Sequence, residues 1–441
     1  MTLAVIGLGF VGLPFALVAA KSGQKVIGVE ADKKKYDTIR NGKVPFYEPK
    51  LENFLKETKD KTFEVTNDIN YAVSNSDIIF LCVNTPENED SSVNLTYLKT
   101  AAAQIGKSIK KGNNEFPVIV VKSTVPPQTT ESLVKNTLEE FSLKKVGEEF
   151  GLAMVPEFMR EGSAVNDIQN PHLVVIGTND DKTDDRLTSL FESIYQNSKP
   201  PTLHTSIVNS ELIKYVNNAF LATKISFINT IANICNNIPG ANVETIAEAI
   251  GRDPRIGKLF LNAGPGYGGS CFPKDLSDFV NYSKSIGYNP LLLESTQQVN
   301  QTQPKKIIEI ITKKSGELHG KQIAVLGISF KKDTDDIRQS PSIKIIHQLL
   351  ELGANVKTHD PKALPNLKKI FNDKLVYCTD IAKCLKDTDL CVILTDWDEY
   401  QSLSADDFIK NMNEPRVFDT RRIINPEKML TVDYFALGYG N

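Results

Sequence analysis

The chain has 441 residues, with 51 lysines and arginines against 54 aspartates and glutamates, so its net charge is −3. This balance argues against nucleic acid as a partner, because nucleic-acid-binding domains are usually strongly basic. Six cysteines without a CxxC pair exclude a disulfide scaffold and a cysteine-rich zinc module, and the five scattered histidines predict no metal site. At ~150 residues per domain, the length predicts about three domains.

Residues 3–20 carry no charge and could be mistaken for a membrane segment. Gly7, Gly9, Gly12 and Pro14 interrupt the stretch, and no basic residue precedes it as one would in a secretory signal. We interpret it as a buried strand over residues 3–6, a glycine turn and a helix over residues 11–21. No other uncharged stretch has the length of a span, so we expect a cytoplasmic protein with no membrane partner and with reduced cysteines.

The first third of the chain alternates short apolar runs with helical stretches, which is the pattern of a parallel sheet covered on both faces. We expect further strands over residues 24–29, 77–83, 117–121 and 173–176, and a break at residues 199–201. Apolar residues then recur mostly three or four positions apart from 207 to 236, which predicts one long helix. Such a helix suits a connection between domains or a subunit interface.

The last third repeats the order of the first. Residues 324–327, 352–356 and 388–392 echo residues 4–7, 22–26 and 76–80. We infer an α/β fold in which two Rossmann-like, doubly wound parallel-sheet domains are joined by a long central helix and a helical dimerisation region. The expected domains cover residues 1–200, 201–305 and 306–441. Chance similarity between two parallel-sheet domains is the alternative.

The segment Gly7-Leu8-Gly9-Phe10-Val11-Gly12 fits the GxGxxG fingerprint, because it follows a strand and opens a helix. An acid, Glu30, ends the next expected strand. It can accept hydrogen bonds from a ribose diol and would repel a 2′-phosphate, so it favours NAD over NADP. Lys33, Lys34 and Lys35 are an opposing feature, since a lysine could pair with that phosphate. A glycine turn without a ligand is the alternative.

The C-terminal repeat lacks this fingerprint, because Gly327 is followed by Ile-Ser-Phe-Lys. That domain is therefore expected to hold a different ligand. Lys331 and Arg338 either face phosphates or form a solvated basic pair among aspartates, and spacing alone favours the second interpretation.

The densest chemical signal is residues 264–275, where four glycines within six positions form a loop that admits a ligand. Pro273 suits the first turn of a helix running to about residue 285. Cys271 would then lie at a helix N-terminus beside Lys274, and both features favour its nucleophilic thiolate form. Most cysteines are inert core residues, which fits Cys82, Cys235 and Cys391 in apolar runs but not Cys271.

Two further clusters of charged residues each leave two interpretations. Glu211, Lys214 and Asn218 share one helix face; spacing favours an exposed Glu–Lys pair, whereas a buried lysine and amide would hold an oxyanion. Glu157, Arg160 and Glu161 form either a surface ion pair or part of a shaped loop, and the flanking Pro156 and Gly162 favour the loop.

Together these residues resemble the UDP-glucose/GDP-mannose dehydrogenase family over essentially the full length of the chain. The strongest match is Gly268-Gly-Ser-Cys-Phe-Pro-Lys-Asp275, and the others are residues 7–12, 83–86, 122–126, 156–162, 218–224, 330–338 and 418–421. Residues 255–261 and 266–271 look like the branch that acts on UDP-glucose. The resemblance implies oxidation of the sugar C6 alcohol to a carboxylate by two NAD and one water, in a homodimer or higher oligomer.

The resemblance also implies the role of individual residues. Cys271 would form a thiohemiacetal and then a thioester, Lys214 and Asn218 would stabilise the C6 oxygen, and the remaining catalytic residues, which handle water and protons, would be Asp275, Thr124 and Glu157. The implied cofactor-binding residues are Gly7, Gly9, Phe10, Val11, Gly12, Glu30, Lys35, Val83, Thr85, Pro86, Ser123, Thr124, Glu161, Lys274 and Arg338. The implied substrate-binding residues are Glu157, Phe158, Met159, Arg160, Lys214, Asn218, Arg255, Phe260, Leu261, Gly264, Tyr267, Gly268, Gly269, Phe330, Lys331 and Arg421, with Arg255 reaching the neighbouring subunit's substrate.

The chain departs from the family pattern at a few positions that remove no catalytic group. Val155 replaces an asparagine, Glu30 an aspartate, Thr420 a glycine, and His172-Leu173 an arginine with a β-branched residue. One alternative is a sibling enzyme acting on another UDP-hexose, a UDP-N-acetylhexosamine or GDP-mannose. A hydroxyacid dehydrogenase would need neither a nucleophilic cysteine nor a second Rossmann-like domain. A non-catalytic NAD-binding sensor would not need the five groups Cys271, Lys214, Asn218, Asp275 and Glu157.

Overall fold

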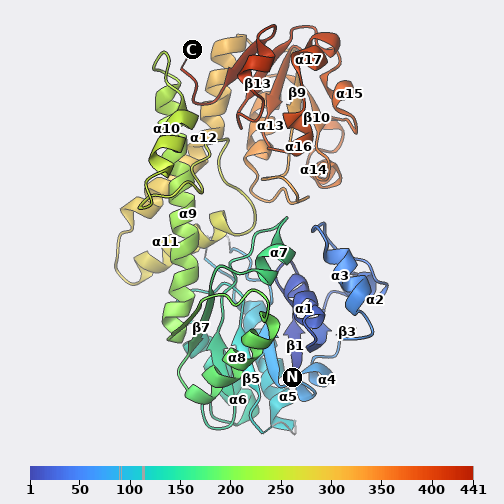
Figure 1. Cartoon of the computed structure of the whole chain (residues 1–441), viewed down its shortest axis with the longest axis vertical. Helices are drawn as coiled ribbons and strands as arrows, with labels where there is room; N and C mark the ends of the chain where they lie inside the picture. The colour runs from blue at the N-terminus through green and yellow to red at the C-terminus, as the bar shows by residue number, and fades with distance from the viewer. Residues whose placement is uncertain (89, 91, 112–114, 441) are drawn as a thin grey trace. The chain divides into compact units, whose positions relative to one another are not determined.

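The computed structural model describes residues 1–88, 90, 92–111 and 115–440, and it divides into two compact units, Met1–Asn217 and Asn218–Asn441 (Figure 1). One helix, α9 (Ile207–Cys235), belongs to both units. The expected long helix is thus confirmed almost to the residue. Among the helices of the described residues, none combines the length and apolar character that a membrane span requires.

The first unit is built on an eight-stranded sheet in the order β3-β2-β1-β4-β5-β6-β7-β8. Its strands are β1 (Thr2–Ile6), β2 (Lys25–Val29), β3 (Phe63–Thr66), β4 (Ile78–Leu81), β5 (Val118–Val121), β6 (Gly151–Met154), β7 (Val174–Thr178) and β8 (Thr202–Thr205). Its helices are α1 (Gly12–Lys21), α2 (Lys33–Arg40), α3 (Leu51–Thr58), α4 (Ile69–Ser74), α5 (Thr96–Lys111), the π-helix η1 (Thr130–Val134), α6 (Lys135–Ser142), α7 (Ala164–Gln169) and α8 (Asp181–Ile194).

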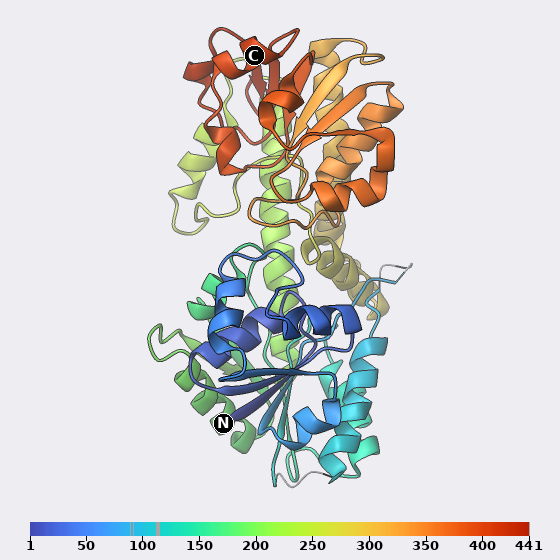
Figure 2. The ribbon, with the colours of Figure 1, turned by 90° about the vertical axis from the view of Figure 1, so that its right-hand side faces the viewer.

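Both faces of this sheet are buried, which explains why its strands are continuously apolar rather than alternating. On β1, Leu3 and Val5 pack into a core that includes residues of α1, α3 and α8. Ala4 and Ile6 face the opposite core, which includes residues of α4, α5 and α6. Figure 2 shows helices on both sides of the strands.

The edge of the first sheet differs from the parallel arrangement expected from the sequence. Strands β3 to β6 are parallel, but β7 pairs antiparallel with β6, and β8 then pairs parallel with β7. The apolar run of β7 indicates burial but carries no information on direction, and an antiparallel pair at the edge of a parallel sheet is common. Strand β8 also lies just beyond the break expected at residues 199–201.

The second unit carries a six-stranded, all-parallel sheet in the order β11-β10-β9-β12-β13-β14. Its strands are β9 (Gln322–Leu326), β10 (Asn355–His359), β11 (Val376–Tyr377), β12 (Leu390–Ile393), β13 (Arg416–Asp419) and β14 (Asp433–Ala436). This is the Rossmann order, so the similarity between the two ends of the chain reflects a shared fold. The prediction of two Rossmann-like sheets is confirmed.

Helices precede and surround this second sheet. They are α10 (Val243–Gly251), α11 (Phe272–Ser285), α12 (Leu291–Ser315), α13 (Pro341–Glu351), α14 (Leu364–Phe371), the 3₁₀ helix η2 (Asn372–Lys374), α15 (Ile381–Leu385), α16 (Asp398–Gln401), α17 (Ala405–Asn411) and the 3₁₀ helix η3 (Pro426–Met429). The C-terminal segment returns to α10, where Asn242 and Tyr439 form an isolated bridge.

Candidate active site

The glycine turn after β1 has the geometry that a dinucleotide requires. Gly7 adopts a φ of 94°, and a Cβ on it would lie 2.7 Å from the Cys82 carbonyl oxygen. A Cβ on Gly12, the first residue of α1, would lie 1.9 Å from the Gly7 carbonyl oxygen. A Cβ on Gly9 would meet the protein only in ordinary van der Waals contact, 3.6 Å from the Asn84 side-chain oxygen. The turn therefore leaves room for a pyrophosphate at the N-terminus of α1.

Glu30 is fixed beside this turn at the end of β2. Its carboxylate accepts the backbone N–H groups of Leu8 at 3.2 Å and Asp32 at 2.9 Å, and its side chain is buried. Lys33 and Lys34 begin α2 and are exposed, while the Lys35 N–H is capped by Asp32. A carboxylate held here suits a ribose diol, so the residues present fit NAD.

The loops that follow β4 and β5 are joined by side-chain hydrogen bonds. The Ser123 hydroxyl donates to the Val83 carbonyl oxygen at 2.6 Å, and the Thr85 hydroxyl donates to the Thr124 carbonyl oxygen at 3.0 Å. Four predicted cofactor-binding residues are therefore brought together at the carboxyl ends of adjacent strands, where ligands bind in open α/β sheets.

Lys214 is buried and pairs with Glu157. Its Nζ lies 2.9 Å from the Glu157 Oε1 and donates to the Glu157 carbonyl oxygen at 2.7 Å. The exposed Glu211–Lys214 pair favoured by spacing is therefore wrong, because both side chains are buried and the partner of Lys214 comes from a distant loop. An ammonium group and a carboxylate held in a dry environment are suited to proton transfer and to stabilising an oxyanion.

The loop that carries Glu157 is shaped, as the proline and glycine around it predict. Arg160 points to the surface, where it pairs with Asp167 at 2.8 Å, whereas Glu161 is buried. Glu48 accepts the backbone N–H groups of Gly162 at 2.7 Å and of Ala164 at 2.8 Å. The sequence gives no sign of this role for Glu48, since a distant segment supplies the two donors.

In the second unit, Cys271 is the N-cap residue of α11, with Pro273 in the first turn as predicted. It is partly exposed, whereas the other five cysteines are buried. Lys274 pairs with Asp275 at 2.8 Å. Burial alone would lower the pKa of Lys274, but the negative charges of Asp275 and Cys271 outweigh it and raise that pKa. A protonated lysine therefore lies near the cysteine and favours its thiolate.

Asn218 and Asp275, both predicted to be catalytic, are in direct contact. The Asn218 side-chain amide donates to the Asp275 Oδ2 at 2.7 Å, and both side chains are buried. Asp275 therefore joins Asn218 to the cation beside the cysteine.

Three amide side chains that the sequence analysis did not identify hold the glycine loop before Cys271. Asn229 of α9 accepts the Gly264 N–H at 2.7 Å, and Gln303 of α12 donates to the Gly264 carbonyl oxygen at 3.0 Å. Asn300 bonds both the N–H and the carbonyl oxygen of Tyr267, at 2.8 and 3.0 Å. The spacing of Asn300 and Gln303 places them on one helix face, a weak signal that could have indicated a shared partner.

The same loop packs closely against the C-terminal domain, which explains its glycines. A Cβ on Gly264 would lie 2.9 Å from the Arg421 guanidinium, and one on Gly268 would lie 2.5 Å from the Gln339 carbonyl oxygen. A Cβ on Gly269 would lie 2.8 Å from the ring of Phe330. Predicted substrate-binding residues from three separate segments of the second unit are therefore neighbours.

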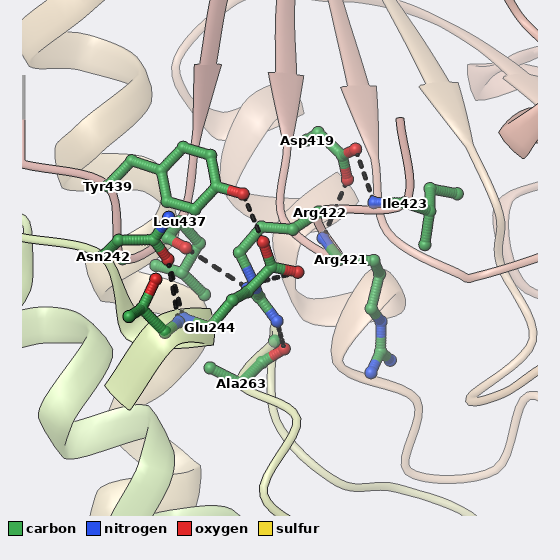
Figure 3. Close-up of polar contacts among 12 residues, drawn as sticks. Asn242, Glu244, Ala263, Asp419, Arg421, Arg422, Ile423, Leu437 and Tyr439 are labelled. Carbon is green, nitrogen blue, oxygen red and sulfur yellow. Dashed lines mark hydrogen bonds and ion pairs between the residues drawn. The ribbon is translucent and has the colours of Figure 1, made fainter. Parts of the chain in front are cut away.

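Arg421 and Arg422 follow β13 and have different surroundings (Figure 3). The buried carboxylate of Asp419 accepts the Arg421 N–H at 3.0 Å, while the Arg421 Nε donates to the Leu394 carbonyl oxygen at 2.9 Å. Arg422, which the sequence analysis did not identify, donates to the carbonyl oxygens of Ala263 at 2.6 Å and Leu437 at 3.2 Å. Arg422 thus fixes the start of the glycine loop.

Two predicted arginines of the second unit lie at exposed positions, whereas the predicted Leu261 is buried. Arg255 is exposed and pairs with Asp253 at 2.6 Å, and Arg338 pairs with Asp336 at 2.7 Å. Phe260, in the left-handed region at a φ of 65°, places its ring 6.2 Å from that of Phe272. Within the described part of the chain, no cluster of three or more histidine, cysteine or acidic residues could hold a metal ion.

Three family models match successive parts of the chain. They describe the NAD-binding, central and UDP-binding domains of the UDP-glucose/GDP-mannose dehydrogenase family and cover residues 1–196, 208–302 and 324–426. The chain belongs to this family. It is therefore an NAD-dependent oxidoreductase of the sugar-nucleotide dehydrogenase type, as the resemblance implied.

Relatives match the chain over essentially its full length. The UDP-glucose 6-dehydrogenase TuaD of Bacillus subtilis is 40% identical, with 99% of this chain and 93% of that protein covered. The UDP-glucose 6-dehydrogenase AglM of Haloferax volcanii is 38% identical, with 99% and 100% covered.

Two solved structures share the fold. A UDP-glucose dehydrogenase from Pyrobaculum islandicum has a TM-score of 0.90 at 33% identity, covering 100% of this chain and 98% of its own. A UDP-D-ManNAc dehydrogenase from Pyrococcus horikoshii has a TM-score of 0.86 at 26% identity, covering 100% of both. The fold therefore accommodates more than one sugar.

Proposed function

We propose that the chain oxidises the C6 alcohol of UDP-glucose to the carboxylate of UDP-glucuronate, reducing two NAD and consuming one water. The observation that carries this proposal is the partly exposed Cys271 at the start of α11, with Lys274 in its first turn. A dehydrogenase that stops at the aldehyde needs no nucleophile, whereas oxidation to the acid does. The names of the relatives favour UDP-glucose among the possible sugars.

The first oxidation requires a proton to leave the C6 hydroxyl as hydride leaves C6, and Asp275 with Thr124 passes that proton to water. Bound NAD supplies the hydride acceptor. Lys214 and Asn218, one turn apart on α9, stabilise the oxygen as it gains charge, because the ammonium and amide groups both donate hydrogen bonds. Asp275 holds the Asn218 amide by accepting one of its two N–H bonds.

The second oxidation uses the cysteine. The Cys271 thiolate adds to the aldehyde carbon to form a thiohemiacetal oxyanion, which Lys214 and Asn218 stabilise. The C6 hydrogen of this oxyanion leaves as a second hydride, which gives a thioester with no further proton to remove. Glu157 removes a proton from the attacking water, with Asp275 and Thr124 assisting. The C–S bond then breaks, the carboxylate is released and Cys271 leaves as thiolate. A free thiol of this kind suits the cytoplasm.

The substrate-binding residues divide between the two parts of a sugar nucleotide. Gly264, Phe330, Lys331 and Arg421 provide the backbone, aromatic and cationic groups that suit a nucleoside diphosphate. Phe260, Leu261 and Tyr267 come from the segment that leads into the cysteine loop, so we assign them to the hexose. Exposed Arg255 is assigned to the substrate of the neighbouring subunit.

The deciding experiment measures NADH formation with UDP-glucose, UDP-N-acetylglucosamine, UDP-N-acetylmannosamine and GDP-mannose in parallel. The proposal requires two NADH per UDP-glucose and a kcat/KM for UDP-glucose that exceeds the others. If another sugar nucleotide is turned over in preference to UDP-glucose, the proposed substrate is wrong, whereas the proposed four-electron reaction still applies. Release of one NADH per substrate would contradict the four-electron reaction.

We expect NAD to exceed NADP in kcat/KM by at least ~100-fold, because a 2′-phosphate beside the buried Glu30 carboxylate costs several kcal/mol. Glu30→Gln should bring the kcat/KM values for NAD and NADP closer together, because it removes the negative charge but retains a hydrogen-bond acceptor. Lys34→Gln is the matched control, since exposed Lys34 should not contact the ribose. Comparable kcat/KM values with both cofactors in the unmodified enzyme would contradict this assignment.

We propose a homodimer through α9, whose exposed apolar side chains form a stripe. Phe220, Phe227 and Ile234 are seven residues apart and remain 64%, 52% and 49% exposed. Positions seven apart share one helix face, and large exposed apolar stripes are typical of subunit interfaces. Val216, four residues before Phe220, extends the stripe and is 51% exposed.

Replacing Phe220 and Phe227 together with glutamate should convert the dimer to monomers, because two charges would then need to be buried in the interface. Sedimentation velocity at assay concentration measures the result. Leu430→Glu is the matched control, since Leu430 is 86% exposed but lies outside the stripe. A fully active monomer in the unmodified protein would refute the proposed dimer.

A further inference from the structure

Glu211 is a fully buried carboxylate that no step of the proposed reaction uses. One of its oxygens accepts the Gln128 N–H at 2.6 Å, and the other accepts the Thr130 N–H at 2.8 Å. Both donors belong to the segment that leads from β5 into η1. Glu211 therefore connects this segment to the first turns of α9.

The segment has a backbone conformation that needs such support. Gln128 lies in the left-handed region at a φ of 73°, where residues other than glycine are uncommon. Its side chain is exposed, so side-chain packing does not hold it there. Strained backbone persists where surrounding contacts determine it, and Glu211 binds the N–H of Gln128 itself and that of Thr130, two residues later.

Two features of the surroundings of Glu211 have opposite effects on the ionisation of its carboxyl group. Burial raises its pKa to about 7, while the N–H bonds from Thr130 and Gln128 act in the opposite direction. A carboxylate this deeply buried is costly unless its oxygens are satisfied, and here each oxygen has a backbone donor.

The other end of the same segment carries Ser123 and Thr124, which are bonded to the loop after β4. The segment is therefore held at one end by Val83 and Thr85 and at the other by Glu211. Lys214 lies one turn beyond Glu211 on α9 and binds Glu157. Glu211 thus couples the segment of Thr124 to the helix of Lys214.

We propose that Glu211 is a positioning residue that sets the placement of Ser123 and Thr124 relative to Lys214. The inference rests on the cofactor and catalytic roles assigned to these residues under the proposed function. It concerns the first unit, so it does not depend on which sugar the second unit binds.

The test is Glu211→Gln, assayed at pH 8, where the original side chain is ionised. The glutamine retains one acceptor oxygen but presents an NH₂ group to the second backbone donor. We expect kcat to fall about 10-fold and KM for NAD to rise several-fold, because small displacements of positioning groups carry large rate costs. The dissociation constant for UDP alone should change less than twofold, because UDP binds the C-terminal domain.

Two matched controls test whether the effects are specific to the carboxylate of Glu211. Gln128→Asn retains the backbone N–H and tolerates a positive φ, and Glu131→Gln changes a neighbouring acid that bonds Asn179 instead. Both should resemble the unmodified enzyme. Hydrogen exchange is a direct readout, since the Gln128 and Thr130 amides should exchange at least tenfold faster in Glu211→Gln alone.

Equal loss of kcat, NAD affinity and UDP affinity with a lowered Tm would show a merely structural role and overturn the inference. Unchanged amide exchange with unchanged kinetics would also overturn it. Should Glu211→Gln fail to fold, Glu211→Asp, which retains the charge but shortens the reach, must show the same faster exchange at Gln128 or Thr130. NAD binding and amide exchange need no sugar nucleotide, so they remain decisive even if UDP-glucose is not the substrate.

Discussion

Cys271→Ser should lower steady-state turnover of UDP-glucose by at least ~10³-fold, the scale on which loss of a covalent nucleophile acts. A serine hydroxyl ionises far less readily than a thiol, so the helix N-terminus and Lys274 cannot supply an anionic nucleophile in the variant. If the hydroxyl adds to the aldehyde and the resulting hemiacetal is oxidised by the second NAD, the product is an ester, whose alkoxide leaves far less readily than a thiolate. The variant should therefore accumulate an ester of the sugar acid, which intact-protein mass spectrometry detects.

Two companion variants make this result specific. Glu157→Gln should accumulate the corresponding thioester on Cys271, because the base for hydrolysis is lost while the nucleophile remains. Cys378→Ser changes a cysteine in the core of the C-terminal sheet domain and should retain turnover. Turnover of Cys271→Ser at the original rate, with two NADH per substrate, would show that the covalent mechanism is wrong.

Features set by local backbone chemistry were predictable from the sequence. The glycine turn at residues 7–12, the helix that starts after Cys271 and the long helix over 207–235 depend on neighbours in the chain. Their signals are the fixed spacing of glycines, a proline in the first helical turn and a three- or four-residue apolar period. The repetition of β9, β10 and β12 was visible for the same reason.

Features set by distant partners were not predictable. The spacing of Glu211 and Lys214 predicted that they pair with each other. In the buried structure, Glu211 instead accepts two backbone N–H groups, and Lys214 pairs with the carboxylate of Glu157. Glu48, Asn229 and Gln303 likewise bond backbone groups that no local pattern connects with them. The direction of β7 was missed because an apolar strand looks the same in both directions.

Asp419→Ala should produce the largest loss of stability in the second unit, about 3–5 kcal/mol. The Asp419 side chain is fully buried, and one oxygen accepts the N–H groups of Ile423 at 2.8 Å and Ile424 at 3.0 Å and the Tyr434 hydroxyl at 3.2 Å. The other accepts the Arg421 N–H at 3.0 Å. Alanine would leave these donors buried without that acceptor, and the urea unfolding midpoint measures the cost.

The carboxylate of Asp419 also shapes the turn that presents Arg421, so UDP affinity should fall with stability under conditions where the variant remains folded (Figure 3). The unfolding midpoint of Asp419→Asn should lie between those of Asp419→Ala and the unmodified chain. The asparagine has one carbonyl oxygen, so it can accept hydrogen bonds from only one of the two sets of donors in the turn. Asp433→Ala is the matched control on the neighbouring strand β14: its carboxylate pairs with Arg416 at the surface and is 57% exposed. That change should cost less than ~1 kcal/mol, since exposed ion pairs contribute little. Equal midpoints for Asp419→Ala and Asp433→Ala would mean that the turn after β13 is held by its packing and not by the buried carboxylate.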